Sequence, residues 1–288
     1  MHKLASCGRY AEGLAEQESR LLKLLKYEAD RLPVAFFFTL TAIDLAIYFF
    51  VGSLWVVAAY WLAMIPIKGF VSAWNHHHQH VPMFKAKPLN RLLELSFAFH
   101  TGATTNAWVL HHVHGHHKHY LDQDLDESRW RRRNGNTYNY FHYTFVTMMT
   151  AYTRAWEVGQ NHPRLRRAFL GYGLLTLAIA VALVVNKPFH GLLLFVFPMI
   201  TSLTITIAAT YRHHSHLDTK DHMQASRNYV GGLHNKLTGN LGYHTAHHYR
   251  QGVHWSKLPE LHASIEDKIP EEFITTASHF VGRPGKIW

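Results

Sequence analysis

The chain has 288 residues, of which 48% are apolar, and it carries a formal net charge of +10. Its single cysteine, Cys7, excludes an internal disulfide framework and any cysteine-rich zinc or iron–sulfur site. A basic and apolar composition leaves two classes, a nucleic-acid binder and a membrane protein with basic flanks. The 26 histidines nearly equal the 29 lysines and arginines, and histidine is the commonest metal ligand.

Residues 1–32 carry acidic and basic side chains throughout and lack the continuous apolar core of a signal peptide. Within them, leucines recur near helical spacing at Leu14, Leu21, Leu25 and Leu32. We therefore expect an amphipathic helix in this N-terminal segment. It either lies on a membrane surface or packs on the body of the protein, and the pattern leaves both open.

Two long apolar stretches follow one another, and a second pair comes much later in the chain. A helix needs roughly 20 residues to cross a bilayer. We predict spans over 33–51, 53–71, 168–185 and 189–210. The segment 89–109 is too polar to be predicted as a span. The predicted fold is an all-α membrane protein with four transmembrane helices in two hairpins, in a domain over 33–265 followed by a tail over 266–288.

Lysine and arginine concentrate in the N-terminal segment, in the loop between the two hairpins and in the C-terminal third. The loop holds "RWRRR" (129–133), whereas the two hairpin tips share one lysine, Lys187. Positive residues mark the cytoplasmic side of a membrane protein. We therefore expect both termini and the central loop to be cytoplasmic. This distribution explains the basic charge without nucleic-acid binding.

The histidines gather in four clusters on one predicted side of the membrane. They are "HHHQH" (76–80), "HHVHGHH" (111–117), "RHHSH" (212–216) and "HTAHH" (244–248). The first and third clusters follow the second and fourth spans. Loops and helix ends can therefore bring all four clusters into one cytoplasmic helical cap.

The spacing within the clusters indicates metal binding. His76 and His80 are four residues apart, so both rings project from one face of a continuing helix. Two later clusters each put one histidine a turn ahead of an adjacent pair: His112 with His116 and His117, and His244 with His247 and His248. Adjacent side chains diverge, so each pair can serve two ions, and we predict a dimetal site. Imidazole suits Zn, Cu, Fe and Ni, and the ligand type alone does not name the metal.

These clusters resemble the three histidine boxes of the integral-membrane fatty acid desaturase and hydroxylase superfamily. The pattern HxxxH, then HxxHH or HxxxHH, then H/QxxHH reads here as "HHHQH", "HVHGHH" and "HTAHH". The segment "GNLGYHTAHHYRQGVHWSKLPELH" (239–262) is typical of the acyl desaturase branch. The resemblance extends over about 33–265. It implies a histidine-ligated diiron centre, with two iron ions, that activates O₂ and attacks an unactivated C–H bond of an acyl chain.

Carried over by position, the resemblance implies a set of metal ligands: His76, His80, His112, His116, His117, His216, His244, His247 and His248. Part of the family has an asparagine four residues before the position of His216, where this chain has Arg212. His213 and Asn240 are the candidates for a further ligand. Asp122 and Asp126 either hold ligand imidazoles through their distal N–H groups or form a solvated acidic turn.

Two residues near the spans are candidates for a substrate tunnel, Asp44 and Trp74. An ionisable residue inside a span marks function by default, although Asp44 can equally bond a neighbouring helix. Among His, Asp and Glu, the predicted spans hold Asp44 and the end-placed His190 alone. A metal transporter needs such groups along a pathway, so this pattern disfavours transport.

The resemblance implies an O₂-dependent fatty acyl desaturase that introduces a C=C or a C≡C bond. The alternative is a fatty acid or alkane hydroxylase on the same scaffold. The head group of the substrate stays open among acyl-CoA, acyl carrier protein and lipid. Because the sequence has no redox motif of its own, an external ferredoxin or a cytochrome with its reductase is expected to supply electrons.

Overall fold

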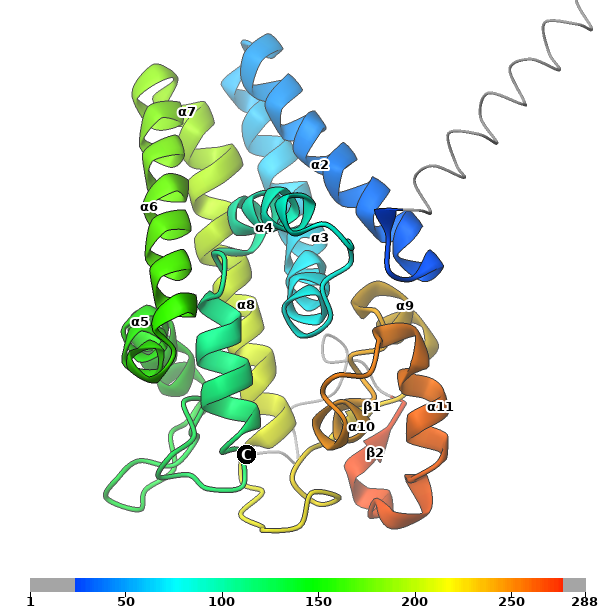
Figure 1. Ribbon diagram of the computed structural model, residues 1–288. Helices are drawn as coiled ribbons and strands as arrows, with labels where there is room; N and C mark the ends of the chain where they lie inside the picture. The colour runs from blue at the N-terminus through cyan, green and yellow to red at the C-terminus, as the bar shows by residue number, and fades with distance from the viewer. Residues whose placement is uncertain (1–23, 277–288) are drawn as a thin grey trace, which may run out of the picture.

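The structure is a computed structural model that describes residues 24–276 (Figure 1). Within these residues, four segments are long and apolar enough to cross a membrane. They are α2 (Arg31–Phe50), α3 (Leu54–His80), α6 (Pro163–Asn186), and a fourth segment made of α7 (Pro188–Gly191), the π-helical η4 (Leu192–Val196) and α8 (Phe197–His214). The predicted all-α fold with four spans in two hairpins is confirmed.

Two of these helices continue beyond the predicted ends of their spans. The second and fourth spans were predicted to end at residues 71 and 210, but α3 runs to His80 and α8 to His214. Once a helix is nucleated, each added residue contributes a backbone hydrogen bond, so a helix does not stop where apolar residues end. The first histidine cluster and His214 therefore stand on extensions of the spans.

The tips of the two hairpins lie at the same end of the molecule, opposite the histidine-bearing ends of α3 and α8 (Figure 1). The Lys187 ammonium donates to the carbonyl oxygens of Tyr48 at 2.9 Å and Phe49 at 3.1 Å. His190 donates through Nε2 to the Val51 carbonyl at 2.8 Å. The last carbonyls of a helix have no partner within it, so these contacts satisfy the end of α2 and join the hairpins.

The segment predicted to be too polar for a span forms α4 (Lys87–Thr101), which packs against α2, α3 and α8 and is not among the four spanning segments. It ends at Gly102, where φ is +71°. A Cβ at this glycine would lie 2.2 Å from the carbonyl oxygen of Met199. Both the backbone conformation and the close approach require glycine here. This approach holds α4 against the fourth span.

The π-helical η2 and residues 215–276 cover the histidine-bearing ends of α3 and α8 (Figure 1). We call these residues the cap. The π-helical η2 (Val109–His117) packs against α5 (Tyr140–Val158), which contacts α8. The other cap elements are β1 (Asn228–Tyr229), α9 (Gly232–Thr238), α10 (His244–Tyr249), η5 (Trp255–Lys257), α11 (Leu258–Ala263), η6 (Glu266–Lys268), η7 (Glu271–Phe273) and β2 (Ile274–Thr275). Two short turns, η1 (Glu28–Asp30) and η3 (Gly159–Asn161), precede α2 and α6.

The beginning of the predicted C-terminal tail is folded onto the cap. β2 pairs with β1 in parallel, with Ile274 opposite Asn228. Ile269 is buried in one cluster with Ile265 and Ala246, the last of which belongs to α10. Residues up to 276 thus support the helix that carries the last histidine cluster. Residues 277–288 of the predicted tail lie outside the described part of the chain.

The cap is also tied to the start of the first span. The Asp30 carboxylate is fully buried, and its Oδ1 atom lies 3.0 Å from Nε2 of His254 and accepts from Nε1 of Trp255 at 2.8 Å. Of the predicted amphipathic segment, residues 1–23 lie outside the described residues. In the described remainder, Leu25 is buried and bridges to Phe84.

A charged pair is buried between the first two spans. Nζ of Lys68 donates to Oδ2 of Asp44 at 2.7 Å and to the carbonyl of Leu194 in η4 at 3.1 Å. The Tyr60 hydroxyl donates to the other carboxylate oxygen at 2.8 Å. Both oxygens of Asp44 are therefore satisfied by neighbouring groups. This is the second of the two possibilities for Asp44, a bond to a neighbouring helix, and its place beside a substrate stays a prediction.

Candidate metal centre

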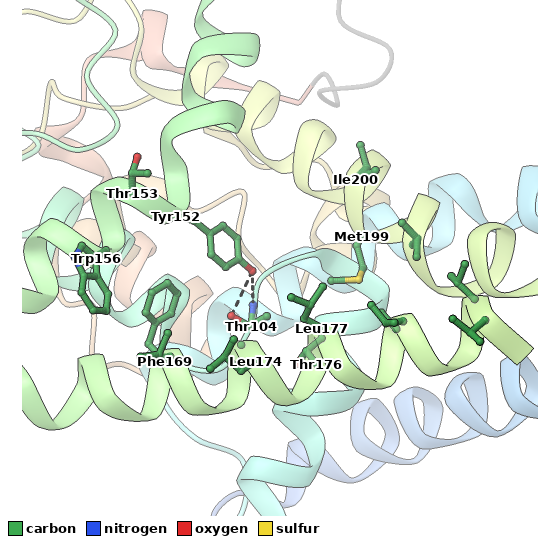
Figure 2. Close-up of a pocket in the computed structure, with 17 residues that line it drawn as sticks. Thr104, Tyr152, Thr153, Trp156, Phe169, Leu174, Thr176, Leu177, Met199 and Ile200 are labelled. Carbon is green, nitrogen blue, oxygen red and sulfur yellow. Dashed lines mark hydrogen bonds between the residues drawn. The ribbon is translucent and has the colours of Figure 1, made fainter. Parts of the chain in front are cut away.

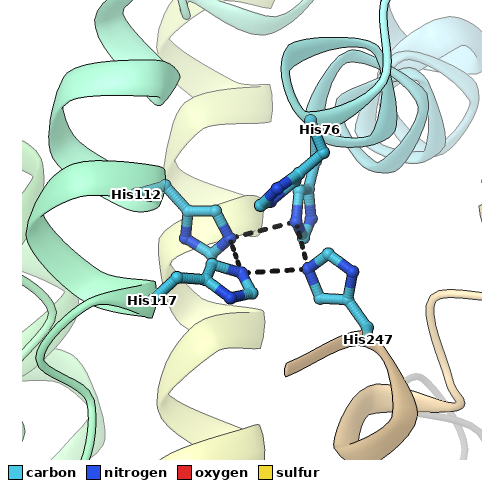
Figure 3. Close-up of side chains that lie close together, drawn as sticks. His76, His112, His117 and His247 are labelled. Carbon is cyan, nitrogen blue, oxygen red and sulfur yellow. Dashed lines mark hydrogen bonds between the residues drawn. The ribbon is translucent and has the colours of Figure 1, made fainter. Parts of the chain in front are cut away.

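Five imidazoles from three parts of the chain converge at the end of α3. Figure 3 shows four of them around a common centre, His76 from α3, His112 and His117 from η2, and His247 from α10. Their Nε2 atoms form a closed ring with successive separations of 2.9, 3.0, 3.0 and 3.0 Å. The fifth is His80, whose buried Nε2 has no hydrogen-bond partner. We call these five residues the first group.

The separations within the first group fit a bound metal ion. Two nitrogens bound at right angles lie about 1.4 times the metal–nitrogen distance apart, and that distance is about 2.1 Å for histidine ligands. The expected separation is therefore about 3.0 Å, which is what the ring shows. Four imidazole nitrogens packed this closely, and a fifth that is buried without a partner, could hold a shared cation.

A second group lies beside the first and consists of His116, His214 and His248. Nε2 of His214 lies 3.3 Å from Nε2 of His116 and 2.9 Å from Nε2 of His244. Neither ring nitrogen of His248 has a hydrogen-bond partner, although both are buried. His244 thus adjoins the second group as a fourth imidazole. This arrangement again offers several uncharged nitrogen donors to one position.

Hydrogen bonds behind the second group orient its rings. Nδ1 of His116 lies 2.8 Å from Oδ1 of Asp126, and Nδ1 of His214 lies 2.9 Å from the carbonyl of Ala225. Since both partners are acceptors, each Nδ1 must carry the proton and donate it. The Nε2 lone pairs then point into the group. Such contacts are usual around a metal-ligating histidine, and the role of Asp126 in holding a ligand imidazole stays a prediction.

We expect Asp126→Asn to weaken metal binding at the second group. The carboxylate accepts from both His116 and the backbone N–H of Ser128, and an amide cannot hold the imidazole as strongly. Loss of such an outer partner costs about 10–100-fold in metal affinity. Competitive metal titration of the purified protein measures this. Asp122→Asn is the matched control, and equal affinities in the two variants would contradict the role of Asp126.

Each adjacent histidine pair is divided between the two groups. His117 and His247 belong to the first group, whereas their neighbours His116 and His248 belong to the second. The rings of His117 and His248 stack at 4.1 Å between centroids, so the groups are in direct contact. This is the geometry predicted for two metals, and the assignment of these residues as ligands stays a prediction.

Burial makes these imidazoles suitable donors. It lowers the pKa of His112, His117 and His247 well below the usual histidine value, and the neighbouring imidazoles lower it further. The same causes lower the pKa of His244 and His248. All five rings are therefore neutral at pH 7, and each can offer a lone pair to a metal.

His216 belongs to the implied ligand set, but it lies outside both groups in the structure. Its φ is +63°, and its ring lies against Trp130, with centroids 5.6 Å apart. His214, which was not in the implied set, takes part in the second group instead. The helix α8 ends at His214, so the chain turns before His216 and directs that ring away.

We expect His214→Ala to lose the metal of the second group and His216→Ala to retain it. The reason is the position of His214, whose Nε2 lies within 3.3 Å of those of both His116 and His244. Metal content per protein, measured by inductively coupled plasma mass spectrometry, distinguishes the variants. A loss of metal in His216→Ala with none in His214→Ala would restore the implied assignment.

The remaining predicted residues lie near the groups but make other contacts. His213 pairs through Nδ1 with the carbonyl of Arg227 and stacks on His244 at 3.7 Å. Asn240 donates to the carbonyl of Trp255, and Asp122 accepts from the backbone of Asp124 at a loop surface. Asp122 therefore follows the second expectation, a solvated acidic turn. Trp74 donates to the carbonyl of Leu237 at 2.9 Å and so joins α3 to α9.

A small cavity of about 70 Å³ borders the first group and His244. His76 and His112 of the first group and His244 beside the second form part of its wall. The rest of the wall includes apolar residues of α3 and α8, namely Phe70, Ala73, Ile205 and Ala209, together with the hydroxyl-bearing Ser72, Thr206, Thr210 and Thr238. We call it the histidine cavity. An apolar molecule in this cavity would lie against members of the first group and against His244.

A much larger hollow of about 720 Å³ lies elsewhere, between α5, α6 and α8 (Figure 2). No histidine lines it, and its wall includes exposed side chains of the third span such as Leu174, Leu177 and Val181. The Tyr152 hydroxyl at its inner side donates to the carbonyl of Gly102 at 2.6 Å. This membrane hollow faces the region of the lipid chains, so its size alone does not make it the reaction site.

Comparison with known proteins gives one family. The family model described as fatty acid desaturase matches residues 53–279. The match includes α3, both later spans and all four histidine clusters. No curated protein and no solved structure gives a significant match to the chain.

Proposed function

The chain belongs to the fatty acid desaturase family, and we propose that it is an O₂-dependent fatty acyl desaturase of the membrane. The observation that carries the proposal is the pair of adjoining imidazole groups, with a cavity beside them that His76 and His112 of the first group and His244 line. The overall reaction is –CH₂–CH₂– + O₂ + 2e⁻ + 2H⁺ → –CH=CH– + 2H₂O. It takes one C–H hydrogen from each of two neighbouring carbons.

The two groups suit two iron ions. Iron bound there would supply the oxidising power that removal of hydrogen from a methylene requires, which redox-inert zinc cannot supply. His76, His80, His112, His117 and His247 would hold one ion, and His116, His214, His244 and His248 the other. Imidazole is a common iron ligand.

The chain's own residues would position the substrate in the histidine cavity. The apolar part of its wall, which includes Phe70, Ala73 and Ile205, would contact methylene groups of the substrate. Its histidine side limits how deeply a chain enters, so these wall residues set which carbons lie closest to the two groups. At about 70 Å³ the cavity holds only a short stretch of an acyl chain. The rest of the chain must extend outward between the helices.

Electrons must come from a separate protein, such as a ferredoxin or a cytochrome with its reductase. The substrate is an acyl-CoA, an acyl carrier protein thioester or a lipid.

We place the cap and both termini on the cytoplasmic side, because the basic residues gather there. The ion pair of Asp44 with Lys68 supports an enzyme over a transporter, since the carboxylate is already bound within the protein.

Expression in a bacterial host with added iron, followed by mass spectrometry of its fatty acids, tests this function. We expect new unsaturated chains that require O₂ and disappear in the His247→Ala variant. Hydroxylated chains would instead assign the alternative reaction on the same site. If the iron-loaded protein with a competent reductase yields no product from acyl or alkane substrates, both oxidative functions are wrong.

A further inference from the structure

Two small voids lie between the membrane hollow and the histidine cavity. The outer void has a volume of about 10 Å³, and the inner void about 20 Å³. Both lie among α5, α8 and the residues that lead into η2. Neither is used in the reaction proposed above, and each adjoins the next cavity through shared wall residues.

The shared residues place the four cavities in one order. Tyr152 lines both the membrane hollow and the outer void. Ala151 and His111 line the outer and inner voids, and Trp108 lines both of these and the histidine cavity. His112 lines the inner void and the histidine cavity, so the series ends on a member of the first group. The cavities therefore form a line from the lipid-facing surface to the histidines.

The size of the outer void limits what can pass along this series of cavities. A volume of about 10 Å³ corresponds to roughly one water-sized probe. An acyl chain would need all the constrictions to be open at once along its length. A diatomic molecule needs only one opening at a time, and side chains fluctuate enough for this on short timescales.

The chemistry of the outer void favours an apolar molecule. Ala103, Ala107, Ala151 and Leu203 contribute to its wall, and the surface that it exposes is apolar. Water or an ion would lose hydrogen bonds on entering such a place. An uncharged apolar molecule loses none, and it also dissolves in the hydrocarbon region from which the series starts.

We propose that this line of cavities delivers dioxygen from the bilayer to the histidine groups. The inference rests on the proposed function, since it concerns the co-substrate of that reaction. It separates the two substrates in space. Dioxygen arrives from the side of α5 and α6, and the acyl chain occupies the histidine cavity between α3 and α8.

The test narrows the outer void at Ala151. Ala151→Val adds two methyl groups to the wall shared by both voids. Ala155→Val is the matched control, because Ala155 stands one turn further along α5, is also buried and lines none of the four cavities. Both variants would be loaded with iron, reduced without oxygen and mixed rapidly with buffers of increasing O₂ concentration.

We expect the second-order rate constant for reoxidation by O₂ to fall several-fold in Ala151→Val and to stay unchanged in Ala155→Val. The KM for O₂ should rise by the same factor, while the KM for the acyl substrate stays constant. Saturating O₂ should restore turnover, which a misfolded variant would not allow. If Ala151→Val does not fold, Ala107→Val narrows the same void from another element.

Two results would overturn the inference. One is an unchanged rate of reoxidation in the narrowed variants. The other is a raised KM for the acyl substrate alone, which would make the cavities part of the acyl site. If the reduced, iron-loaded wild-type protein does not react with O₂ at all, the proposed function itself fails, and that result is distinct from the other two.

Discussion

His247→Ala is expected to abolish product formation and to remove the metal of the first group. Nε2 of His247 lies 2.9 Å from that of His76 and 3.0 Å from that of His117, so its loss opens the ring of four nitrogens. Removal of an outer partner alone costs about 10–100-fold in metal affinity or activity, and removal of a direct donor should cost at least about 100-fold. Iron content and fatty acid profiles measure the two effects.

His142→Ala is the control for this variant, because His142 is exposed on α5 and contacts Arg132 away from both groups. It should retain iron and product. A His247→Ala protein with full iron content and normal product would show that the ring of nitrogens is not a metal site. Loss of product with full iron content would instead assign His247 a role in substrate placement.

Lys68→Met is expected to give the largest loss of stability among single substitutions in the spans. It leaves the Asp44 carboxylate buried without its cation, and breaking such a pair costs about 3–5 kcal/mol. The double variant Lys68→Met with Asp44→Leu should recover most of the stability, because an apolar pair of similar volume replaces the ion pair. Thermal unfolding of the purified protein in detergent measures both.

Lys236→Met, at an exposed position on α9, is the matched control and should leave the unfolding temperature unchanged. The double variant separates the two possible roles of Asp44. If it is stable and active, the pair is structural. If it is stable but its product profile changes, Asp44 also influences how the acyl chain lies. A Lys68→Met protein as stable as the wild type would contradict the buried ion pair.

The sequence predicted the spans and indicated most of the histidines that gather in the two groups, because both depend on short-range patterns. A fold without membrane spans cannot easily bury apolar runs of bilayer length. The positions of His76 and His80 on one face follow from their spacing within a single helix. Lys68 could have been predicted as the partner of Asp44, since each is a charge inside one of two adjacent spans. An unpaired charge there is too costly to persist.

Other parts of the site depend on geometry that spacing does not encode. η2 is π-helical, with hydrogen bonds between residues five apart, and His112 and His117 therefore meet at 3.0 Å within one group. If the same residues formed an α-helix, His112 would lie on one face with His116, four residues later. The choice of His214 over His216 depends on where α8 ends. The folding of residues 266–276 onto the cap depends on a two-residue strand, which is too short to be recognised in the sequence.

The donors of both histidine groups have a consequence for electron flow. Every member of the two groups is an imidazole, so a pair of bound ions would keep its full positive charge. The nearest carboxylate in contact, Asp126, acts only through His116. Uncompensated positive charge in a buried place favours the gain of an electron. An all-imidazole centre should thus have a higher reduction potential than a carboxylate-rich one, and a weak reductant would suffice to drive it.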